Sequence, residues 1–218
     1  MGDIIKLAIV LFIISMVAGF AIGFTDSKTK ETIENQRRAK DNTALASVFP
    51  EGVSTTAYKS SAEIATPHWV GKMDDITVGY AFKGSNRGYS SDIKYIIGID
   101  TNGVIMGLSI ISQVETPGLG TRLEETISKK YIWNGLFAKK VKETPWFWDQ
   151  FKGISIEKNI TIDKSNEWHR MTEPERKRLH NENAISGLTG ATISTKAVSE
   201  GIKKTAGAYF YKCKEIYN

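Results

Sequence analysis

The chain has 218 residues, a formal net charge of +5 at pH 7 and 41% hydrophobic residues, which leaves room for one domain of ordinary size and an anchor. The Lys and Arg residues are scattered and no basic stripe is interleaved with aromatic residues, which argues against nucleic-acid binding. A single cysteine, Cys213, excludes an internal disulfide and a Cys-rich metal or iron–sulfur site. The three histidines, His68, His169 and His180, are far apart in polar contexts, which argues against a zinc site.

The first predicted element is a membrane anchor at residues 1–26. Residues 7–24 are uncharged and almost wholly apolar, close to the roughly 20 residues that cross a bilayer core. A cleaved signal peptide is the alternative, because Lys6 supplies a basic start and residues 21–23 resemble a cleavage site. The apolar stretch exceeds the usual h-region of about 7–15 residues, which favours a retained anchor.

The charges around the anchor leave its orientation open. Counted directly, the positive-inside rule would place the following domain in the cytoplasm, but a long domain can translocate regardless of its charge. A mildly basic domain is also compatible with an anionic membrane surface. One basic residue, Lys6, precedes the apolar stretch, and five follow it closely: Lys28, Lys30, Arg37, Arg38 and Lys40.

A polar, helix-compatible stalk is predicted at residues 27–46, before a single domain at residues 47–218. The domain starts with a hydrophobic stop and a turn at residues 48–52. Alternating apolar residues then predict a three-stranded antiparallel meander of residues 76–82, 93–99 and 104–111, with turns at residues 83–88 and 100–103.

The segments after the meander are expected to be mostly helical. A loop at residues 115–120 precedes a helix-favouring segment at residues 122–137, and dense aromatic residues at 146–151 precede a short strand at residues 154–156. A short helix is expected at residues 174–180, with Thr172 as its cap and Pro174 in its first turn. Strands first and helices around them indicate an α+β domain.

The last predicted helix starts at Ser194 and has one buried face. Apolar side chains recur along it at three- and four-residue spacing. We expect the thiol of Cys213 to be buried because it falls on that face. The residues of the face are Val198, Ile202, Ala206, Tyr209, Cys213 and Ile216.

Residues 189–196, Thr-Gly-Ala-Thr-Ile-Ser-Thr-Lys, form a small-residue hydroxyl cluster directly before this helix. Gly190 and Ala191 let a bulky group approach the backbone, and Thr192 offers a hydroxyl. A helix N-terminus offers free N–H groups and a positive dipole end, which suit a phosphate. The cluster therefore indicates a phosphate site at Thr192. The alternative is an ordinary loop whose Ser or Thr caps the helix; neither a G-x-G-x-x-G nor a P-loop motif is present.

Read in order along the whole chain, these features resemble the FMN-binding subunits of bacterial and archaeal ion-pumping redox complexes. The chain is most similar to the G subunit of the Rnf-type ferredoxin:NAD oxidoreductase, and its length favours that type over the related C subunit of the sodium-pumping NADH:quinone oxidoreductase. The resemblance rests on the anchor, the stalk, the hairpin strands and five motifs: residues 48–50, 88–89, 115–120, 150–153 and 189–192.

The resemblance implies that residues 47–218 carry FMN covalently, as a phosphate ester of Thr192. A separate flavin transferase that takes FMN from FAD would attach it. Ser186 stands where the family often has Asp, three residues before the signature. The resemblance also implies Thr116 as a hydrogen-bond partner of the flavin ring and Leu119 as an apolar contact. Cofactor-binding roles follow for Thr189, Gly190, Ala191, Ser194, Thr195, Glu115, Thr116, Gly118, Leu119, Gly120 and, as a phosphate-neutralising cation, Lys152.

The implied function is electron transfer within a multisubunit complex coupled to Na⁺ or H⁺ transport. The domain would lie on the extracytoplasmic side of the cell membrane, with membrane lipid and the other membrane subunits as partners. No residue is expected to act as a catalytic acid or base, because electron transfer requires none. The alternative from another class is a non-redox anchored scaffold or binding protein, in which the Gly-Ala-Thr segment only caps a helix.

Overall fold

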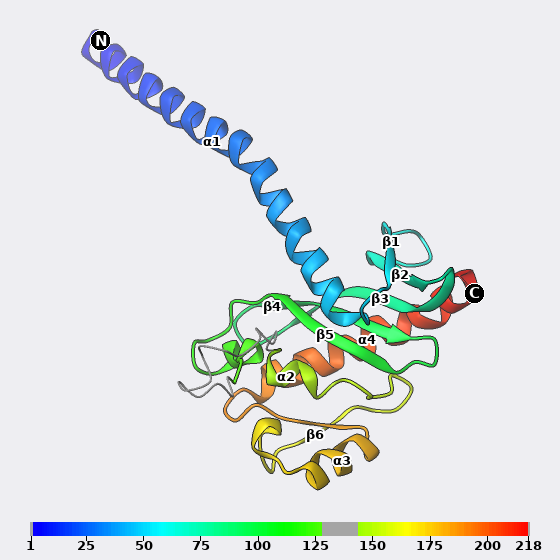
Figure 1. The fold of residues 1–218 in the computed structure, drawn as a ribbon. Coiled ribbons are helices and arrows are strands. Elements are labelled where there is room, and N and C mark those ends of the chain that lie inside the picture. Colours follow the sequence, from blue (N-terminus) through cyan, green and yellow to red (C-terminus); the bar gives the residue numbers. More distant parts are fainter. Residues whose placement is uncertain (1, 128–143, 218) are drawn as a thin grey trace, which may run out of the picture. The chain divides into compact units, whose positions relative to one another are not determined.

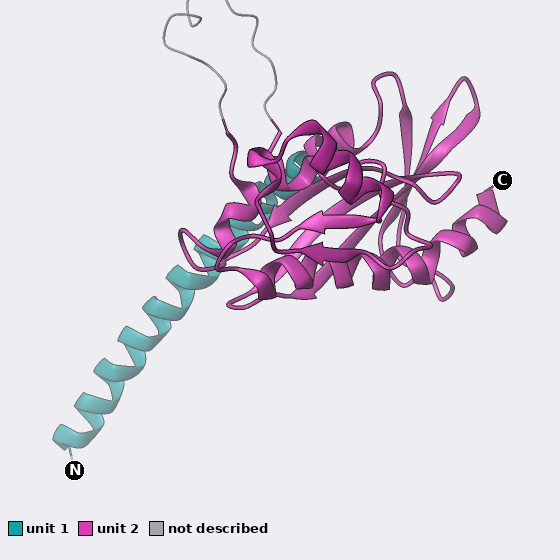
Figure 2. Cartoon of the chain, turned by 90° about the horizontal axis from the view of Figure 1, so that it is seen from below, with its two compact units in different colours: residues 1–42 teal, residues 43–218 magenta. Residues whose placement is uncertain are grey.

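The computed structural model describes residues 2–127 and 144–217. The chain divides into two compact units, residues 1–42 and 43–218, which Figure 2 shows in separate colours. The first unit is most of a single helix, α1 (Gly2–Val48), so the predicted anchor and stalk form one continuous helix. The three-segment division with boundaries after residues 26 and 46 stays a prediction.

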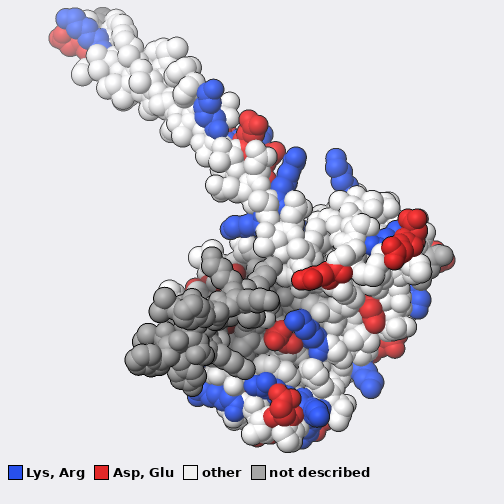
Figure 3. Space-filling model, in the orientation of Figure 1, with Lys and Arg blue, Asp and Glu red and all other residues white. Residues whose placement is uncertain are grey.

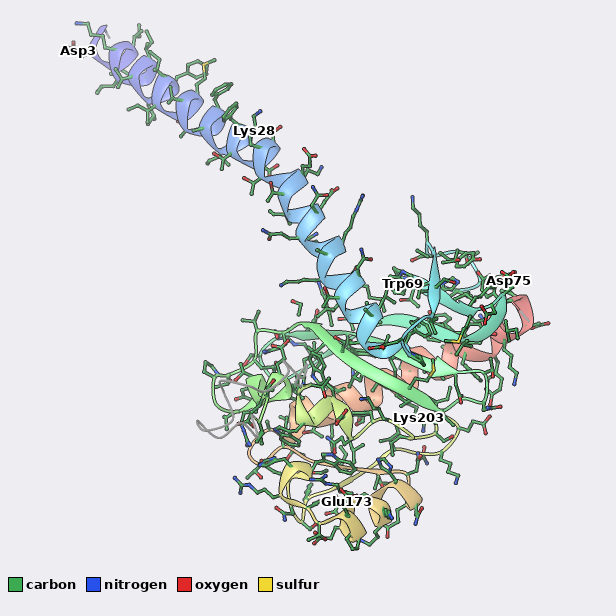
Figure 4. All side chains as sticks on the ribbon, viewed as in Figure 1. Asp3, Lys28, Trp69, Asp75, Glu173 and Lys203 are labelled. Carbon is green, nitrogen blue, oxygen red and sulfur yellow. The ribbon has the colours of Figure 1, made fainter. Side chains whose placement is uncertain are left out.

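The apolar part of α1 carries no charged side chain between Lys6 and Asp26. Figure 4 labels Asp3 and Lys28 near its two ends, and Figure 3 shows the uncharged surface of the helix between them. In the described part of the chain, α1 is the one helix whose length and composition suit a membrane crossing, and none of its most apolar window is buried.

The second unit is built on a five-stranded antiparallel sheet in the order β1-β2-β3-β4-β5. The three predicted strands correspond to β3, β4 and β5 and are confirmed. The first two strands of the sheet, β1 and β2, were not predicted. The bounds are β1 (Ser54–Tyr58), β2 (His68–Met73), β3 (Ile76–Arg87), β4 (Asp92–Asp100) and β5 (Ile105–Ser112).

The turn predicted at residues 83–88 is wrong for most of its length. Strand β3 continues to Arg87 and pairs with β4 as far as Asp92, so the chain reverses only at residues 88–91. Gly84 suggested a turn but serves packing. A Cβ atom on Gly84 would come within 2.4 Å of the Tyr95 ring, whose side chain is fully buried.

The sheet has a core on each face because neighbouring residues of a strand point to opposite faces. On one face, Tyr80 and Phe82 belong to the main core with helix α4 (Thr192–Tyr217), which Figure 1 shows along the sheet. On the other face, Ala81 and Ile96 form a smaller core with the last turn of α1, which contributes Ala44, Leu45 and Val48.

Two paired glycines let the last turn of α1 rest directly on the sheet. Gly98 of β4 lies opposite Gly107 of β5. A Cβ atom would come within 2.5 Å of the Val48 carbonyl oxygen at Gly98, and within 2.8 Å of the Val48 Cα at Gly107. These contacts are with backbone atoms, so no side-chain rotation relieves them.

We therefore expect Gly98→Ala to destabilise the second unit by about 1–3 kcal/mol, the usual cost of overpacking a tight core. Chemical denaturation of the full chain measures this change. Gly207→Ala is the matched control, because no heavy atom lies within 4 Å of the Cβ position there. Alanine is also preferred over glycine in helices by about 1 kcal/mol. Equal stability of the two variants would contradict the packing argument.

The segment between the sheet and α4 folds into short elements. Thr172 caps α3 and Pro174 lies in its first turn, as predicted, and Glu175 completes a capping box that was not predicted. Strands β6 and β7 form a parallel pair. The elements are η1 (Gly120–Glu124), α2 (Trp146–Asp149), β6 (Thr161–Asp163), η3 (Trp168–Arg170), α3 (Glu173–Asn181) and β7 (Ala184–Ser186).

Two predictions for this segment are corrected. The helix expected at residues 122–137 is a 3₁₀ turn that ends at Glu124, residues 125–127 are not helical, and the rest lies outside the described residues. The strand expected at residues 154–156 forms only one isolated bridge, between Val104 and Ser155. Its pairing stops there because the chain turns away after three hydrogen bonds with residues 103–105.

Helix α4 begins at Thr192, two residues before the predicted start. Of the predicted apolar face, Val198, Ile202, Ala206 and Cys213 are buried and Tyr209 is half-buried. Burial raises the pKa of the Cys213 thiol to about 12. Ile216 is 48% exposed, which contradicts its prediction, whereas Phe210, absent from the predicted face, is buried. The α+β class is confirmed: an antiparallel sheet carries its helices around it (Figure 1).

Candidate functional site

The start of α4 and the loop of residues 115–120 enclose a cavity of about 680 Å³, which we call the main pocket. This volume lies within the range of typical small-molecule sites. Most of the predicted site residues meet in this pocket, although they come from two segments that are far apart in the sequence, residues 115–120 and 190–194. Its lining residues are Tyr89, Glu115, Thr116, Leu119, Gly120, Gly190, Ala191, Thr192, Ile193 and Ser194.

The loop wall of the pocket is held by short-range hydrogen bonds. The N–H of Leu119 donates to the Thr116 carbonyl over 3.1 Å, and the N–H of Gly118 donates to the Thr121 hydroxyl over 3.1 Å. Gly118 has a φ of +75°, a conformation that glycine adopts most readily. The resulting turn leaves Leu119 43% exposed at the pocket.

Glu115 ties this loop to two other segments. Its buried carboxylate accepts hydrogen bonds from the backbone N–H groups of Tyr89, Ser90 and Ser91 at 3.0–3.2 Å, and from the hydroxyl of Ser194. Burial raises the pKa of Glu115, but these hydrogen bonds outweigh it and hold the pKa below its ordinary value. The carboxylate is therefore ionised and fully occupied, so it positions the pocket walls and has no acceptor left for a ligand.

The hydroxyls at the start of α4 differ in availability. Thr195 is fully buried; its Oγ1 accepts from the N–H of Leu188 and donates to the Ala191 carbonyl, both at 3.1 Å. Ser194 is 1% exposed and bound to Glu115. Thr192 is half-buried, lines the pocket and is the first residue of the helix. Of the hydroxyls at the start of α4, that of Thr192 is the one accessible from the pocket.

Gly190 shapes the entry to α4. Its φ is +78°, and a Cβ atom there would come within 3.0 Å of Leu119 Cδ2. Glycine therefore keeps the main pocket open between the loop and the helix. Thr189 is exposed and does not line the main pocket.

A buried ion pair fixes the backbone just before the pocket. Both oxygens of Glu167 accept from the Arg122 guanidinium at 2.8 and 2.9 Å, and one of them also accepts from the N–H of Thr189 at 3.2 Å. The hydrogen bond with Glu167 raises the pKa of Arg122 above its ordinary value. Arg122 also contacts Glu125 at 2.9 Å. This network attaches the Thr189 loop to η1.

Lys152 is not brought to the main pocket. It is exposed and pairs with Asp149 at 2.7 Å. The nearby residue Gln150 is fully buried, and its side chain amide bonds both the N–H and the carbonyl of Ser186, at 2.7 and 3.2 Å. The motif at residues 150–153 therefore braces β7. The Ser186 hydroxyl accepts from the Trp168 N–H and donates to the carbonyl of Asn166.

The histidines have separate partners. His68 bonds the hydroxyl of Tyr217 at 3.0 Å, His169 packs on Trp146, and His180 stacks on Trp168. In the described part of the chain, no group of three or more His, Cys, Asp or Glu residues is arranged to hold a metal ion.

A comparison with known families matches residues 88–207, which include every lining residue of the main pocket, to the FMN-binding domain. The chain belongs to the FMN-binding domain family. The pocket suits this cofactor: it has apolar walls, a glycine-opened entry and an accessible hydroxyl at a helix N-terminus, where an anion is favoured.

Relatives within the family extend the similarity along the chain. The G subunit of the Na⁺-translocating ferredoxin:NAD⁺ oxidoreductase complex of Acetobacterium woodii is 30% identical over 94% of this chain and 91% of its own length. The G subunit of the ion-translocating oxidoreductase complex of Aliivibrio fischeri MJ11 is 25% identical, over 95% of this chain and 90% of its own. The solved structure of Shewanella oneidensis NqrC aligns at a TM-score of 0.48 and 15% identity, covering 78% of this chain and 73% of that one.

Sequence reasoning missed four residues of the FMN-binding domain. Tyr89 and Ile193 line the main pocket and are 67% and 52% exposed. Tyr89 belongs to the motif at residues 88–89 and Ile193 to the cluster at residues 189–196, but neither residue was assigned a cofactor-binding role. Arg122 and Glu167 fix the Thr189 loop, but they are 45 positions apart. No local pattern indicates that pairing.

Acid is expected to weaken the domain through Glu167. The hydrogen bond from Arg122 is the main cause of its lowered pKa, about 2 against the ordinary 4.5; burial opposes the shift, and the Thr189 N–H adds to it. Because the pKa is lower in the folded state, this contribution is complete above about pH 4.5 and is lost as the pH falls toward about 2.

Urea unfolding at several pH values measures this dependence. Glu167→Gln is expected to flatten the acid limb, though not remove it, because the pKa values of Glu115 and Glu125 are lowered too. If the free energy of unfolding fell with decreasing pH as steeply in Glu167→Gln as in the original chain, the charge of Glu167 would not stabilise the domain at neutral pH.

Proposed function

We propose that this chain is a membrane-anchored, FMN-carrying subunit of an ion-translocating ferredoxin:NAD oxidoreductase complex, in which it transfers electrons. Its FMN-binding domain and its similarity to G subunits along more than nine-tenths of its length support the proposal. The other membrane subunits of the complex would be its partners. Purification of the native membrane complex, with identification of the co-purifying subunits, separates this role from one in a sodium-pumping NADH:quinone reductase.

We infer further that FMN is held covalently through Thr192. The observation that carries this inference is the availability of hydroxyls: Thr192 is accessible in the main pocket, while Ser194 and Thr195 are buried and hydrogen-bonded. Thr192 also starts α4, where free N–H groups and the helix dipole favour a phosphate.

A separate flavin transferase would attach FMN by transferring the FMN part of FAD to Thr192. The Oγ of Thr192 forms a bond to the flavin-side phosphorus, the bond from that phosphorus to the bridging oxygen breaks, AMP leaves, and the hydroxyl proton is released. The product is a phosphodiester that keeps one negative charge. A covalent link prevents loss of the cofactor from a half-open pocket.

The chain supplies position and polarity around the flavin, while the bound flavin supplies the electron-accepting and electron-donating chemistry. Tyr89, Leu119 and Ile193 offer exposed apolar surface at the main pocket, suited to a planar aromatic ring. Thr116 lines the same pocket and shares a hydrogen bond of 3.2 Å with the Ser90 hydroxyl, so its side chain is oriented. No side chain is required to move a proton.

We place the apolar part of α1 in the cell membrane as a retained anchor and the domain on its extracytoplasmic side. The length and composition of α1 support the first proposal, and the family resemblance supports the second. Protease treatment of intact cells or spheroplasts tests the side. Digestion of the domain before lysis is expected, and digestion only after lysis would contradict it.

The decisive experiment is expression of the full chain with and without a flavin transferase. After denaturing electrophoresis, the band is expected to fluoresce only when the transferase is present. A dark band in both cases would contradict covalent flavin and favour a non-redox scaffold or binding protein. Mass spectrometry of the peptide containing Thr192 then identifies the mass of the attached group.

A further inference from the structure

A second hollow meets the main pocket at Thr192. It has a volume of about 390 Å³ and shares Gly190 and Thr192 with the main pocket. Thr189 lines it as well, together with Lys164 and Arg170. Thr192 therefore stands between two cavities of different character, and the second pocket contains cationic side chains.

The charges that line the two pockets differ in sign. Among the described residues that line the main pocket, Glu115 is the charged one, and it is ionised. The second pocket has Lys164 and Arg170 and one acid, Glu167. Arg122 binds Glu167 through two hydrogen bonds but also pairs with Glu125, so the charge of Glu167 is counted in full. The two cations still leave the lining of the second pocket with a net positive charge. The second pocket is thus the cationic side of Thr192.

The helix N-terminus favours an anion at Thr192, but it does not act on that anion alone. The carboxylate of Glu115 is bound to Ser194 in the first turn of α4, where it already uses the favourable dipole. An additional anion on Thr192 would be repelled by Glu115 and needs a cation nearby. Lys152 does not line either pocket and is paired with Asp149.

We propose that the second pocket is the phosphate subsite of the flavin nucleotide, and that Lys164 and Arg170 bind its non-bridging phosphate oxygens. This proposal rests on the proposed function. The Nε of Arg170 donates to His169 Nε2 over 3.2 Å and lies 3.9 Å from Glu167, which together orient the side chain. That side chain is 66% exposed, so the two terminal NH₂ groups of its guanidinium can reach an anion. The flavin ring then occupies the main pocket, and the two halves of the cofactor lie on opposite sides of Thr192.

The subsite predicts a preference for FMN over riboflavin before any covalent bond exists. The full chain is purified in detergent without a transferase, and its affinities for free FMN and riboflavin are measured by flavin fluorescence at low ionic strength. Two charge-assisted hydrogen bonds are expected to favour FMN on the order of tenfold or more. In the double variant Lys164→Gln/Arg170→Gln, the ratio of the two affinities is expected to approach one, while riboflavin binding stays unchanged.

The double variant Lys152→Gln/Lys177→Gln is the matched control, because it removes the same net charge outside both pockets. It is expected to keep the preference for FMN. Three results would each overturn the subsite. The first is equal affinity for FMN and riboflavin in the chain without substitutions. The others are an unchanged preference for FMN in Lys164→Gln/Arg170→Gln, or an equal loss of that preference in the control variant.

A second measurement on the flavinylated protein keeps the two proposals separate. Its ³¹P NMR resonance is expected to shift in Lys164→Gln/Arg170→Gln and not in the control variant. Failure of covalent attachment would appear as a dark gel band for the chain without substitutions when the transferase is present. The relative affinities for free FMN and riboflavin are measured without a transferase, so they test the subsite separately.

Discussion

Thr192→Ala is expected to eliminate covalently bound flavin from the protein. Alanine has no oxygen to esterify, and the neighbouring hydroxyls of Ser194 and Thr195 are buried and hydrogen-bonded, so neither can replace it. The measurement is in-gel flavin fluorescence of the denatured chain after expression with a flavin transferase. The signal is expected to fall to background while the amount of protein stays unchanged.

Two further variants test the assignment at the level of single hydroxyls. Thr192→Ser keeps an oxygen at the same position and is expected to retain flavin. Thr189→Ala removes the exposed hydroxyl nearest in sequence and is also expected to retain flavin. The backbone N–H of Thr189 keeps its hydrogen bond to Glu167 in this variant, although the contribution of the Thr189 side chain to Glu167 is lost. A fluorescent Thr192→Ala band, or a dark Thr189→Ala band, would move the attachment point.

The largest expected effect on stability belongs to Arg122→Met. This change leaves the carboxylate of Glu167, whose side chain is only 4% exposed, without its two guanidinium hydrogen bonds. Loss of one partner of a buried ion pair usually costs about 3–5 kcal/mol, and we expect the lower end of that range because Arg122 is 21% exposed. Tryptophan fluorescence during urea unfolding of the full chain measures the change.

Arg87→Met provides the comparison on the same molecule. Arg87 pairs with Asp92 at 3.6 Å, but both side chains are more than half exposed. Pairs of this kind contribute about 0–1 kcal/mol. Similar losses in the two variants would mean that burial of the Arg122–Glu167 pair is unimportant to the fold.

The parts of the fold that could be predicted from sequence are those with a local period. Alternating apolar residues identified β3 to β5, and the three- and four-residue spacing after Thr192 identified α4. Strand β1 was missed because it is largely exposed and lacks an apolar alternation. Strand β2 was missed because its first four residues are all buried, so it shows no alternation either. The sequence around Gly84 predicts a turn because glycine signals turns, while its small size here admits the Tyr95 ring.

The main pocket was predictable as two loops but not as a network. Residues 115–120 and 189–192 stood out by composition, and the structure brings them together. Some side chains of these loops face the pocket and others stabilise its walls. The difference depends on hydrogen-bond and ion-pair partners, several of which are distant in the sequence. Glu115 was expected to bind the cofactor, yet its partners at residues 89–91 and 194 use its oxygens. Lys152 was expected beside the phosphate from the family resemblance, and it pairs with Asp149 outside the main pocket instead.

The carboxylate of Glu115 also determines how the cofactor-free protein behaves. The two walls of the main pocket can separate only if the ionised carboxylate of Glu115 loses its hydrogen-bond donors. Because that loss is costly, we expect all of these hydrogen bonds to break in a single opening event. The binding geometry is thereby organised during folding, before any nucleotide arrives, and little conformational freedom remains to be lost on association. The amide hydrogens of residues 89–91 are expected to exchange with solvent as one cooperative group, whether or not the protein carries its flavin.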